Sequence, residues 1–299
     1  MKILITGSNG LLGQKIVRQC MDHNIDFCAS SKGDNRNPDC PSDRYVGMDI
    51  TSDADVLLVF QSVQPTHVIH TAAMTNVDQC ELNPIECNII NTVSVDRLFR
   101  ASKSVNAHFQ LLSTDFVFDG SKGDYAENDL VHPLSEYAKS KVEAENILLS
   151  DESKNWSISR TIIVYGEGHQ LSRSNIVLWA VDALRKGDPL NIVDDQFRAP
   201  TWADDLAWGC LKICSENASG IFHLCGPETM SIYDLVCRIA IYLGISTDGI
   251  NRVQTNTLTQ AAMRPAKTGF NLSKSRSQLG YSPQTLEATL AQMKTISNK

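Results

Sequence analysis

Tyr137 and Lys141 are the two residues whose spacing most directly suggests chemistry. They stand four positions apart in the stretch Tyr137-Ala-Lys-Ser-Lys141, so on a helix the phenol and the ammonium share one face, one turn apart. A tyrosine with its ordinary pKa of about 10 exchanges its proton reluctantly at neutral pH. A nearby ammonium stabilises the phenolate and lowers the pKa toward the working range. The pair predicts proton transfer to a substrate oxygen, with a chance match on a surface helix as the alternative.

A hydroxyl group precedes this pair along the chain. Thr114 follows the apolar run Phe109–Ser113, which has the composition of a buried strand. In open α/β sheets the carboxyl ends of parallel strands face the ligand, so a hydroxyl there can hydrogen-bond a substrate carbonyl. We therefore predict Thr114, Tyr137 and Lys141 as the catalytic residues. Tyr137 would protonate the substrate oxygen, Thr114 would polarise that oxygen, and Lys141 would lower the tyrosine pKa.

A glycine-rich segment near the start of the chain predicts the cofactor. The segment Thr6-Gly7-Ser8-Asn9-Gly10-Leu11-Leu12-Gly13 follows an apolar strand and begins an amphipathic helix. Glycines here allow a tight turn and let the N–H groups of a helix N-terminus face a pyrophosphate. The spacing is G-x-x-G-x-x-G, and its place between strand and helix favours a dinucleotide site over a plain turn. A nicotinamide cofactor would pass hydride to the carbon of the carbonyl group whose oxygen Tyr137 protonates.

The end of the second predicted strand bears on which nicotinamide cofactor is used. An acid at this place would bind the adenosine ribose and repel a 2′-phosphate. The strand instead ends Ala29-Ser30-Ser31-Lys32, with two hydroxyls and a cation, and Asp34 follows only in the next loop. The sequence therefore favours NADP(H), with NAD(H) possible. Lys32 as a solvated loop charge is the alternative, because lysine is mostly exposed.

The rhythm of apolar runs predicts the fold that positions these residues. Strands are predicted at Lys2–Thr6, Asp26–Ser31, Arg44–Met48, His67–Thr71, Phe109–Ser113, Ser157–Thr161, Leu190–Val193 and Ile221–Leu224. Helices are predicted at Leu11–Met21, Ala54–Gln61, Pro84–Lys103, Ser135–Leu149, Ser174–Lys186, Ala203–Ser215 and Ile232–Leu243. This alternation implies an α/β fold with a Rossmann-type, doubly wound parallel sheet. We expect an NADP(H)-binding Rossmann domain over residues 1–165, with parts of 190–225 returning to the sheet, and a smaller, interleaved C-terminal substrate-binding lobe over 166–299.

Composition argues against several classes of partner. The net charge of −7 over 299 residues disfavours a nucleic-acid backbone, which calls for clustered lysine and arginine. No apolar run reaches the ~18 residues needed to span a bilayer, so no membrane partner is expected. The nine cysteines include no C-x-x-C pair, which predicts a reducing, cytoplasmic location. No spacing of possible ligands predicts a metal site, and we expect a monomer or a homodimer.

Two histidines near these motifs are expected to have no chemical role. His132 precedes Pro133, which favours an exposed turn, and His70 lies within an apolar strand as a core histidine. Asp204 and Asp205 are expected to open a helix, where carboxylates favour the N-terminal dipole.

Several strings of the sequence together resemble one enzyme family. The glycine spacing is similar to that of the extended short-chain dehydrogenase/reductases. The further strings are His70-Thr71-Ala72-Ala73-Met74-Thr75-Asn76-Val77-Asp78, Ser113-Thr114-Asp115-Phe116-Val117-Phe118-Asp119-Gly120, Val193-Asp194-Asp195-Gln196 with Pro200-Thr201, and Arg264-Pro265. Nearly the whole chain thereby resembles the dTDP-4-dehydrorhamnose reductase family. The resemblance implies reduction of a 4-keto-6-deoxy nucleotide sugar, dTDP-4-dehydro-L-rhamnose to dTDP-L-rhamnose, in polysaccharide biosynthesis.

The resemblance also implies roles for individual residues. Asp49 and Ile50 would border the adenine. The implied cofactor-binding set is Gly7, Asn9, Gly10, Leu11, Leu12, Gly13, Ser30, Ser31, Lys32, Asp49, Ile50, Thr71, Ala72, Ala73, Met74, Thr75, Asn91, Tyr137 and Lys141. The implied substrate-binding set is Asn76, Val77, Thr114, Asp115, Phe118, Ile163, Gln196 and Arg198. The family usually has tryptophan where this chain has Ile163, so the identity of the sugar nucleotide stays open at that position.

Two other functions are compatible with the same residues. A nucleotide-sugar epimerase or dehydratase uses the same fold and the Tyr/Lys pair, and Asp115 beside Thr114 offers the acid that a dehydratase would need. Some relatives of the family are NADP-binding regulatory subunits without catalytic activity. The intact residues Thr114, Tyr137 and Lys141 favour a catalyst, because a binding module has no need of them.

Overall fold

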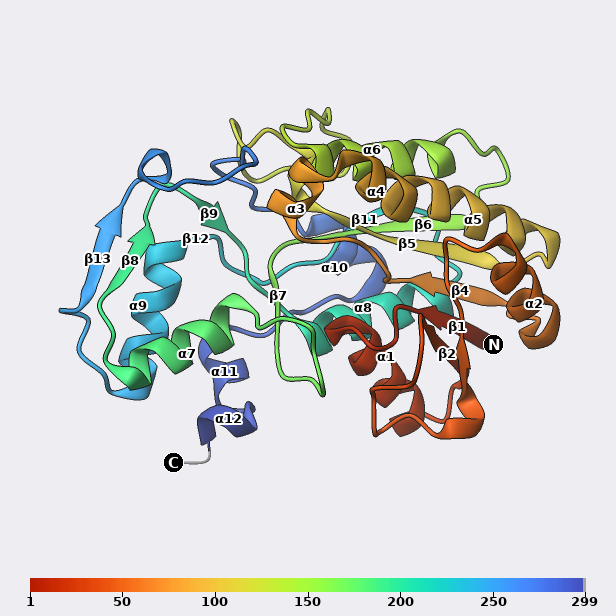
Figure 1. Cartoon of the computed structure of the whole chain (residues 1–299), viewed down its shortest axis with the longest axis horizontal. Coiled ribbons are helices and arrows are strands. Elements are labelled where there is room, and N and C mark those ends of the chain that lie inside the picture. The colour runs from red at the N-terminus through yellow and green to blue at the C-terminus, as the bar shows by residue number, and fades with distance from the viewer. Residues whose placement is uncertain (298–299) are drawn as a thin grey trace.

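The computed structural model describes residues 1–297, and its centre is a seven-stranded sheet in which every strand pair is parallel (Figure 1). The strands are β1 (Lys2–Thr6), β2 (Asp26–Ser31), β3 (Tyr45–Gly47), β4 (His67–His70), β5 (His108–Thr114), β6 (Trp156–Thr161) and β11 (Gly220–His223). Their order is β11-β6-β5-β4-β1-β2-β3. The order reverses between β1 and β4, and ligands bind outside such a switch point in open α/β sheets. The predicted Rossmann-type α/β fold is confirmed.

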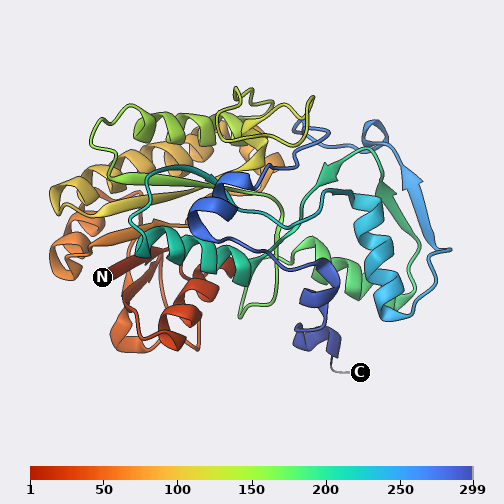
Figure 2. The ribbon, with the colours of Figure 1, turned by 180° about the vertical axis from the view of Figure 1, so that it is seen from behind.

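Helices cover both faces of the sheet, which explains why its central strands are apolar at successive positions. One layer consists of α1 (Leu11–Asp22), α8 (Ala203–Ser215) and α10 (Ser273–Leu279), and the other of α2 (Asp53–Val63), α5 (Ser94–Ser104) and α6 (Glu136–Leu149) (Figures 1 and 2). Along β1, Ile3 and Ile5 belong to the core under the first layer, whereas Leu4 belongs to the core under the second.

The helix predicted over Pro84–Lys103 is interrupted by a π-helical turn. Its parts are α4 (Pro84–Asn88), the π turn η2 (Ile89–Val93) and α5, and the short α3 (Val77–Leu82) precedes them. The apolar periodicity continues across this turn, so the sequence pattern gave no sign of it. Asn91 lies in the turn, accepts from Met74 N at 2.8 Å and donates to Met74 O at 3.0 Å. The π turn thereby fixes the loop that follows β4.

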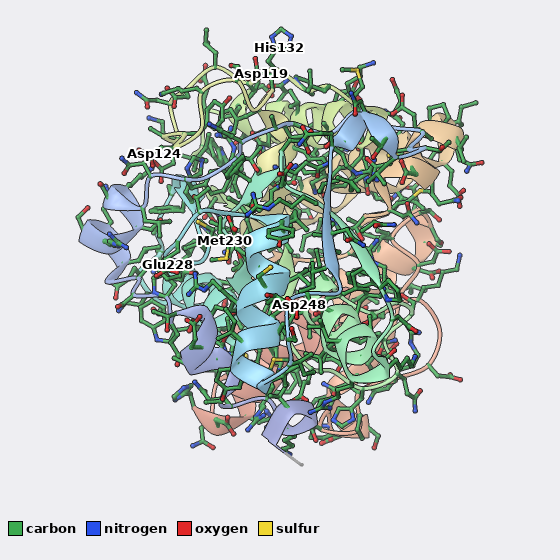
Figure 3. The ribbon with its side chains drawn as sticks, turned by 90° about the vertical axis from the view of Figure 1, so that its left-hand side faces the viewer. Asp119, Asp124, His132, Glu228, Met230 and Asp248 are labelled. Atoms are coloured by element: carbon green, nitrogen blue, oxygen red, sulfur yellow. The ribbon has the colours of Figure 1, made fainter. Side chains whose placement is uncertain are left out.

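A second core forms a smaller lobe, at the left of Figure 1. Here α7 (Ile176–Lys186) packs on α9 (Ile232–Leu243), and β8 (Leu190–Val193) pairs in parallel with β13 (Ile250–Val253). The remaining elements are β7 (Val164–Tyr165), β9 (Phe197–Arg198), β10 (Thr201–Trp202), β12 (Met230–Ser231), α11 (Leu286–Leu290) and α12 (Lys294–Ser297). On the outer side of the lobe, Arg238 of α9 donates to Glu228 at 2.6 Å and lies 3.7 Å from the sulfur of Met230 (Figure 3).

The chain crosses between the sheet and the lobe more than once. Within the segment 190–225, α8 and β11 lie on the sheet, whereas β8 pairs with β13 in the lobe. Later in the chain, α10 packs against β11 and α8. Residues 166–299 are therefore divided between the smaller lobe and the domain that contains the seven-stranded sheet.

A buried ion pair ties α6 to the sheet. Arg160 of β6 donates to both carboxylate oxygens of Glu145, from Nε at 3.0 Å and from Nη2 at 2.7 Å, and both side chains are 2% exposed. Ser113 of β5 also donates to Glu145 Oε1, at 2.5 Å. Two strands therefore hold one carboxylate of the helix that carries Tyr137 and Lys141.

Loss of this pair should be costly. In Arg160→Met the Glu145 carboxylate stays buried without its partner, and removal of one member of a buried pair costs about 3–5 kcal/mol. We expect the free energy of unfolding in urea to fall by that amount. The matched control is Lys186→Met, which breaks an ion pair with Asp182 whose side chains are 61% and 65% exposed and should cost less than about 1 kcal/mol. Equal losses in the two variants would contradict a structural role for the buried pair.

Candidate active site

A cavity of about 720 Å³ lies at the carboxyl ends of the central strands, where the strand order reverses. It brings together the glycine loop, the end of β5 and the first turns of α6, three places far apart in the sequence. Its volume lies within the range of roughly 300–1,000 Å³ that is usual for small-molecule sites. An adjoining cavity of about 470 Å³ extends past the glycine loop toward β2, and Asn9, Gly10 and Arg36 line both cavities.

The glycine loop leaves no room for side chains at two of its positions. Gly7 has φ +76°, and a Cβ there would lie 2.6 Å from the backbone nitrogen of Ala72. A Cβ at Gly13 would lie 2.4 Å from the carbonyl oxygen of Gly7. Helix α1 begins at Leu11, so its N-terminus opens onto the cavity with unpaired N–H groups and a positive dipole end. This arrangement fits the pyrophosphate of a dinucleotide.

The smaller cavity contains the cations and hydroxyls at the end of β2. Ser31 Oγ accepts from the backbone N–H of Asn9 at 3.0 Å, and the Asn9 side chain accepts from Arg36 N at 2.8 Å. Lys32 forms an ion pair with Asp49 at 2.7 Å, and the hydrogen bond from Lys32 is the main reason that the pKa of Asp49 falls to about 2. Arg36 had not been predicted. It lies in a loop beyond β2, where no strand or helix periodicity points to it.

Thr114 and Tyr137 lie together in the larger cavity. Thr114 caps the short 3₁₀ helix η3 (Asp115–Val117) by accepting from Phe116 N at 3.2 Å, which fixes its hydroxyl at the end of β5. Ser135 caps α6 by accepting from Ala138 N at 3.3 Å. Tyr137 therefore stands in the first turn of α6. Burial raises the pKa of the Tyr137 phenol above its usual value, and a hydrogen bond with Thr114 opposes part of that rise.

The pKa of Tyr137 is raised, mainly by burial, and not lowered as the sequence predicted. Lys141 is turned toward the backbone of β5, where its ammonium donates to the carbonyl oxygen of Leu112 at 2.7 Å. Burial also lowers the pKa of Lys141 itself to about 8. The cation that opposes the rise in the Tyr137 pKa is Arg173.

Asp115 and Arg198 form a buried ion pair behind Thr114. Arg198 Nε lies 3.7 Å from Asp115 Oδ2, and the two side chains are 1% and 4% exposed. Asp115 also accepts from Thr268 and, at 3.1 Å, from Thr114. Burial raises the pKa of Asp115, and the charge of Arg198 opposes that rise. Asp115 lines the cavity, but its carboxylate is committed to these three partners.

Most of the predicted site residues line one of the two cavities, and some do not. Those at the larger cavity are Asn9, Gly10, Leu11, Leu12, Gly13, Thr71, Ala73, Thr75, Val77, Thr114, Asp115, Tyr137, Lys141 and Ile163. Those at the smaller cavity include Gly7, Ser30, Ser31, Lys32, Asp49, Ile50, Ala72 and Met74. The residues that line neither are Asn76, Asn91, Phe118, Gln196 and Arg198.

The five residues outside the cavities have structural partners. Asn76 accepts from Gln79 N at 3.1 Å and caps α3, and Asn91 holds Met74 as described above. The ring of Phe118 stacks on that of Tyr125 with centroids 4.0 Å apart. Gln196 donates to Thr255 at 3.0 Å. His132, at the upper edge in Figure 3, is exposed and does not line the cavities either.

The wall of the cavity near the lobe contains a strained residue. Ile163 has φ +31°, which a β-branched residue rarely adopts. Thr201 of β10 holds this conformation, because its N–H donates to Ile163 O at 3.0 Å and its hydroxyl donates to Ile162 O at 2.5 Å. Such strain persists only where surrounding contacts impose it, commonly at ligand sites.

The segment from Gly166 to Asn175 connects β7 to α7 and forms another wall. Gln14 of α1 donates to His169 O at 2.8 Å and accepts from His169 N at 2.8 Å. Asn175 donates to Gly166 O at 2.8 Å and caps α7. Between these anchors, Leu171 to Asn175 line the larger cavity. Their sequence contained no motif that could have shown this.

Residues 1–297 contain neither a cluster of metal-ligating side chains nor a membrane-spanning helix. No group of three or more His, Cys, Asp or Glu side chains is placed to hold a metal ion. No helix in that range combines the length and apolarity required to cross a membrane.

Comparison with known proteins places these features in a family. The family model described as "RmlD substrate binding domain" matches residues 1–298. The chain is 30% identical to the dTDP-4-dehydrorhamnose reductase of Aggregatibacter actinomycetemcomitans, over 97% of each chain. It is also 31% identical to a dTDP-4-dehydrorhamnose reductase of Clostridium acetobutylicum, whose crystal structure superimposes with a TM-score of 0.87 over 100% of both chains.

Two further relatives bear on the cofactor and on the alternative functions. The crystal structure of the Bacillus anthracis dTDP-4-dehydrorhamnose reductase, solved in complex with NADP, has a TM-score of 0.84 at 25% identity and 98% coverage of both chains. The chain is also 27% identical to the methionine adenosyltransferase 2 subunit beta of Xenopus laevis, over 91% of this chain and 81% of that protein.

The buried ammonium of Lys141 should lower stability in a pH-dependent way. Because its pKa falls from 10.5 to about 8 on folding, the unfolded chain binds more protons between these two pH values, and the wild-type free energy of unfolding rises across that window. Below pH 8 the ammonium is protonated in both states, and the full cost of burying its charge lowers the free energy of unfolding. We therefore expect Lys141→Met to be more stable than the wild type at pH 7, by roughly 3 kcal/mol, with the advantage shrinking toward pH 10.5.

Urea unfolding at several pH values between 7 and 10.5 measures this difference. Lys154→Met, at an exposed lysine, serves as the control and should show no such pH-dependent advantage. A constant stability difference between the Lys141 variant and the wild type would contradict the lowered pKa.

Proposed function

The chain belongs to the RmlD substrate binding domain family, and on that premise we propose that it is an NADPH-dependent reductase of a 4-keto-6-deoxy nucleotide sugar. The proposed reaction converts dTDP-4-dehydro-L-rhamnose to dTDP-L-rhamnose. The observation that carries this proposal is the single cavity of about 720 Å³ that contains the glycine loop together with Thr114, Tyr137 and Lys141. Relatives named as dTDP-4-dehydrorhamnose reductases support it over the length of the chain.

The residues present fit a nicotinamide dinucleotide. The absence of side chains at Gly7 and Gly13 leaves the backbone free to approach a pyrophosphate at the N-terminus of α1. Asp49 and Ile50 would border the adenine in the smaller cavity. When bound, the cofactor supplies the hydride that the carbonyl carbon accepts.

NADPH is the preferred cofactor in this proposal, with NADH as the alternative. Ser31, Lys32 and Arg36 line the smaller cavity and offer donors to a 2′-phosphate. Lys32 already pairs with Asp49, whereas no carboxylate within residues 1–297 forms an ion pair with Arg36. Arg36 is therefore the cation best placed to bind the phosphate, since a guanidinium matches phosphate geometry with two parallel hydrogen bonds.

In the proposed mechanism Tyr137 donates the proton. Its raised pKa keeps the phenol protonated at neutral pH, so it can donate to the alkoxide oxygen that develops as the carbonyl is reduced. Thr114 positions that oxygen through its hydroxyl. The ammonium of Lys141, one helical turn further along α6, would hold the nicotinamide ribose.

The environment of Asp115 separates this proposal from a dehydratase. A dehydratase would need an acid free to exchange a proton with the substrate beside Thr114. Asp115 is paired with Arg198 and accepts from Thr268 and Thr114. This favours simple reduction.

A regulatory subunit is the second candidate, because the chain is similar to a protein named as a subunit of methionine adenosyltransferase. The intact Thr114, Tyr137 and Lys141, gathered in one cavity, favour a catalyst. We further propose a cytoplasmic protein, a monomer or a homodimer, with a nucleotide sugar as substrate and no nucleic-acid or membrane partner.

The activity can be tested directly. Purified protein given dTDP-4-dehydro-6-deoxy-L-mannose should oxidise NADPH in proportion to the sugar added, measured by the loss of absorbance of the reduced nicotinamide. Tyr137→Phe should lose at least about 99% of the rate, in line with the usual 10²–10⁴-fold contribution of acid–base catalysis. Tight NADPH binding without oxidation by any 4-keto sugar nucleotide would favour the regulatory subunit instead.

The cofactor preference has its own test. Arg36→Ala should raise the KM for NADPH about tenfold, the equivalent of ~1.4 kcal/mol, and change the KM for NADH less than twofold. Lys122→Ala removes an exposed cation from a different loop and should leave both constants unchanged. An equal rise in the KM for NADPH and in the KM for NADH would exclude a 2′-phosphate contact at Arg36.

A further inference from the structure

The larger cavity is positively charged although the chain as a whole carries a net charge of −7. Arg36, Lys141, Arg173 and Arg264 line it, and Asp115 is the one carboxylate among its lining residues. Asp115 is itself neutralised by Arg198. A cavity with this imbalance favours an anionic ligand.

Three of the four cations have another partner or another place in the proposed site. Arg264 forms a two-point ion pair with Asp78, at 2.6 and 3.2 Å. Lys141 lies at the floor of the cavity and donates to a backbone carbonyl. Arg36 also lines the smaller cavity, at the adenine end of the proposed cofactor site.

Arg173 is limited in none of these ways. It lines the larger cavity alone, its side chain is exposed, and no carboxylate within residues 1–297 forms an ion pair with it. Its Nη2 donates to the Thr75 hydroxyl at 2.7 Å, across the cavity from its own segment. A neutral hydroxyl is a weak partner for a guanidinium, which binds phosphate oxygens more strongly.

Hydrogen bonds hold the segment that carries Arg173 on both sides. Its segment is anchored by Gln14 at His169 on one side and by Asn175 at the start of α7 on the other. Thr75 lies in the loop that Asn91 holds through Met74. Arg173 and Tyr137 line the same cavity, so an anion bound to Arg173 lies in the cavity that contains the reacting groups.

We infer that Arg173 binds the diphosphate of the nucleotide-sugar substrate. This inference rests on the proposed function, which requires a diphosphate one sugar ring away from the carbonyl that Tyr137 protonates. The pyrophosphate of the cofactor has its own place at the N-terminus of α1. The diphosphate of the substrate would therefore bind at the opposite wall. There the guanidinium of Arg173 would exchange its hydrogen bond with the Thr75 hydroxyl for hydrogen bonds with phosphate oxygens.

The test measures binding without turnover. The holoenzyme, saturated with NADP⁺, is titrated calorimetrically with dTDP and, separately, with thymidine, which lacks the diphosphate. Arg173→Met should weaken dTDP binding at least tenfold and leave thymidine and NADP⁺ binding within twofold of the wild type. Arg173→Lys should give an intermediate loss, because it keeps the charge but not the paired donors.

Lys139→Met is the matched control, since it removes an exposed cation from the catalytic helix outside the cavity. It should leave dTDP binding unchanged. Wild-type affinity for dTDP in Arg173→Met, or an equal loss for dTDP and thymidine, would overturn the inference. Failure of the wild type to bind dTDP would overturn it too.

The two proposals can fail independently. Binding of dTDP through Arg173 without any NADPH oxidation would remove the proposed reduction but keep the diphosphate site. Reduction of the sugar nucleotide by a wild-type enzyme whose Arg173→Met variant keeps its affinity for dTDP would remove the site alone.

Discussion

The buried ion pair between Glu145 and Arg160 is the contact on which the geometry of the site depends. Tyr137 and Lys141 belong to a helix, while Thr114 belongs to a strand, and their distances matter only if helix and strand are fixed to each other. Glu145 lies one turn beyond Lys141 on α6 and receives hydrogen bonds from Arg160 of β6 and Ser113 of β5. A buried charge pair tolerates little displacement, since each partner would lose its compensation in a medium of low dielectric.

The electrostatics of the site differ from the simple picture of an ammonium that acidifies a tyrosine. Burial raises the pKa of Tyr137, and Lys141 points to the backbone of β5. A protonated phenol suits a proton donor, which is what reduction of a carbonyl requires. We propose that the cations along the cavity walls, Arg36 and Arg173, bind anions. In this proposal proton transfer occurs at the centre of the cavity and phosphates bind at its two walls.

The fold could be predicted from the sequence because its signals are local. Strand β1, the glycine loop and the Tyr137 helix each show their nature within a dozen residues, through apolar runs, glycine spacing and the i to i+4 pair. The π turn at Ile89–Val93 could not be predicted, since the apolar pattern runs through it unbroken. The short ladders of the lobe, such as β7 with β10, depend on pairing between distant residues that no local pattern encodes.

The site, like the fold, could be predicted from the sequence where local patterns mark its residues. Thr114, Tyr137 and Lys141 follow from type, spacing and strand-end position, and the structure brings them into one cavity. Arg36 and Arg173 lie in loops without periodicity, so only the folded chain shows that they face the cavity. Asp115 and Arg198 were both expected at the substrate, and Asp115 lines the larger cavity whereas Arg198 lines neither. The folded chain joins them to each other, because a buried carboxylate and a buried guanidinium each need an opposite charge.

We propose that this cavity transfers hydride from a free nicotinamide cofactor to a sugar carbonyl. Reaction with NADPH that carries deuterium at the transferable position of nicotinamide C4 can test this, with the product examined by mass spectrometry and NMR. We expect one deuterium at C4 of the sugar, the former carbonyl carbon, for each cofactor oxidised and released. Product without the label, formed while no cofactor is consumed, would contradict it and indicate an enzyme that recycles a bound nicotinamide.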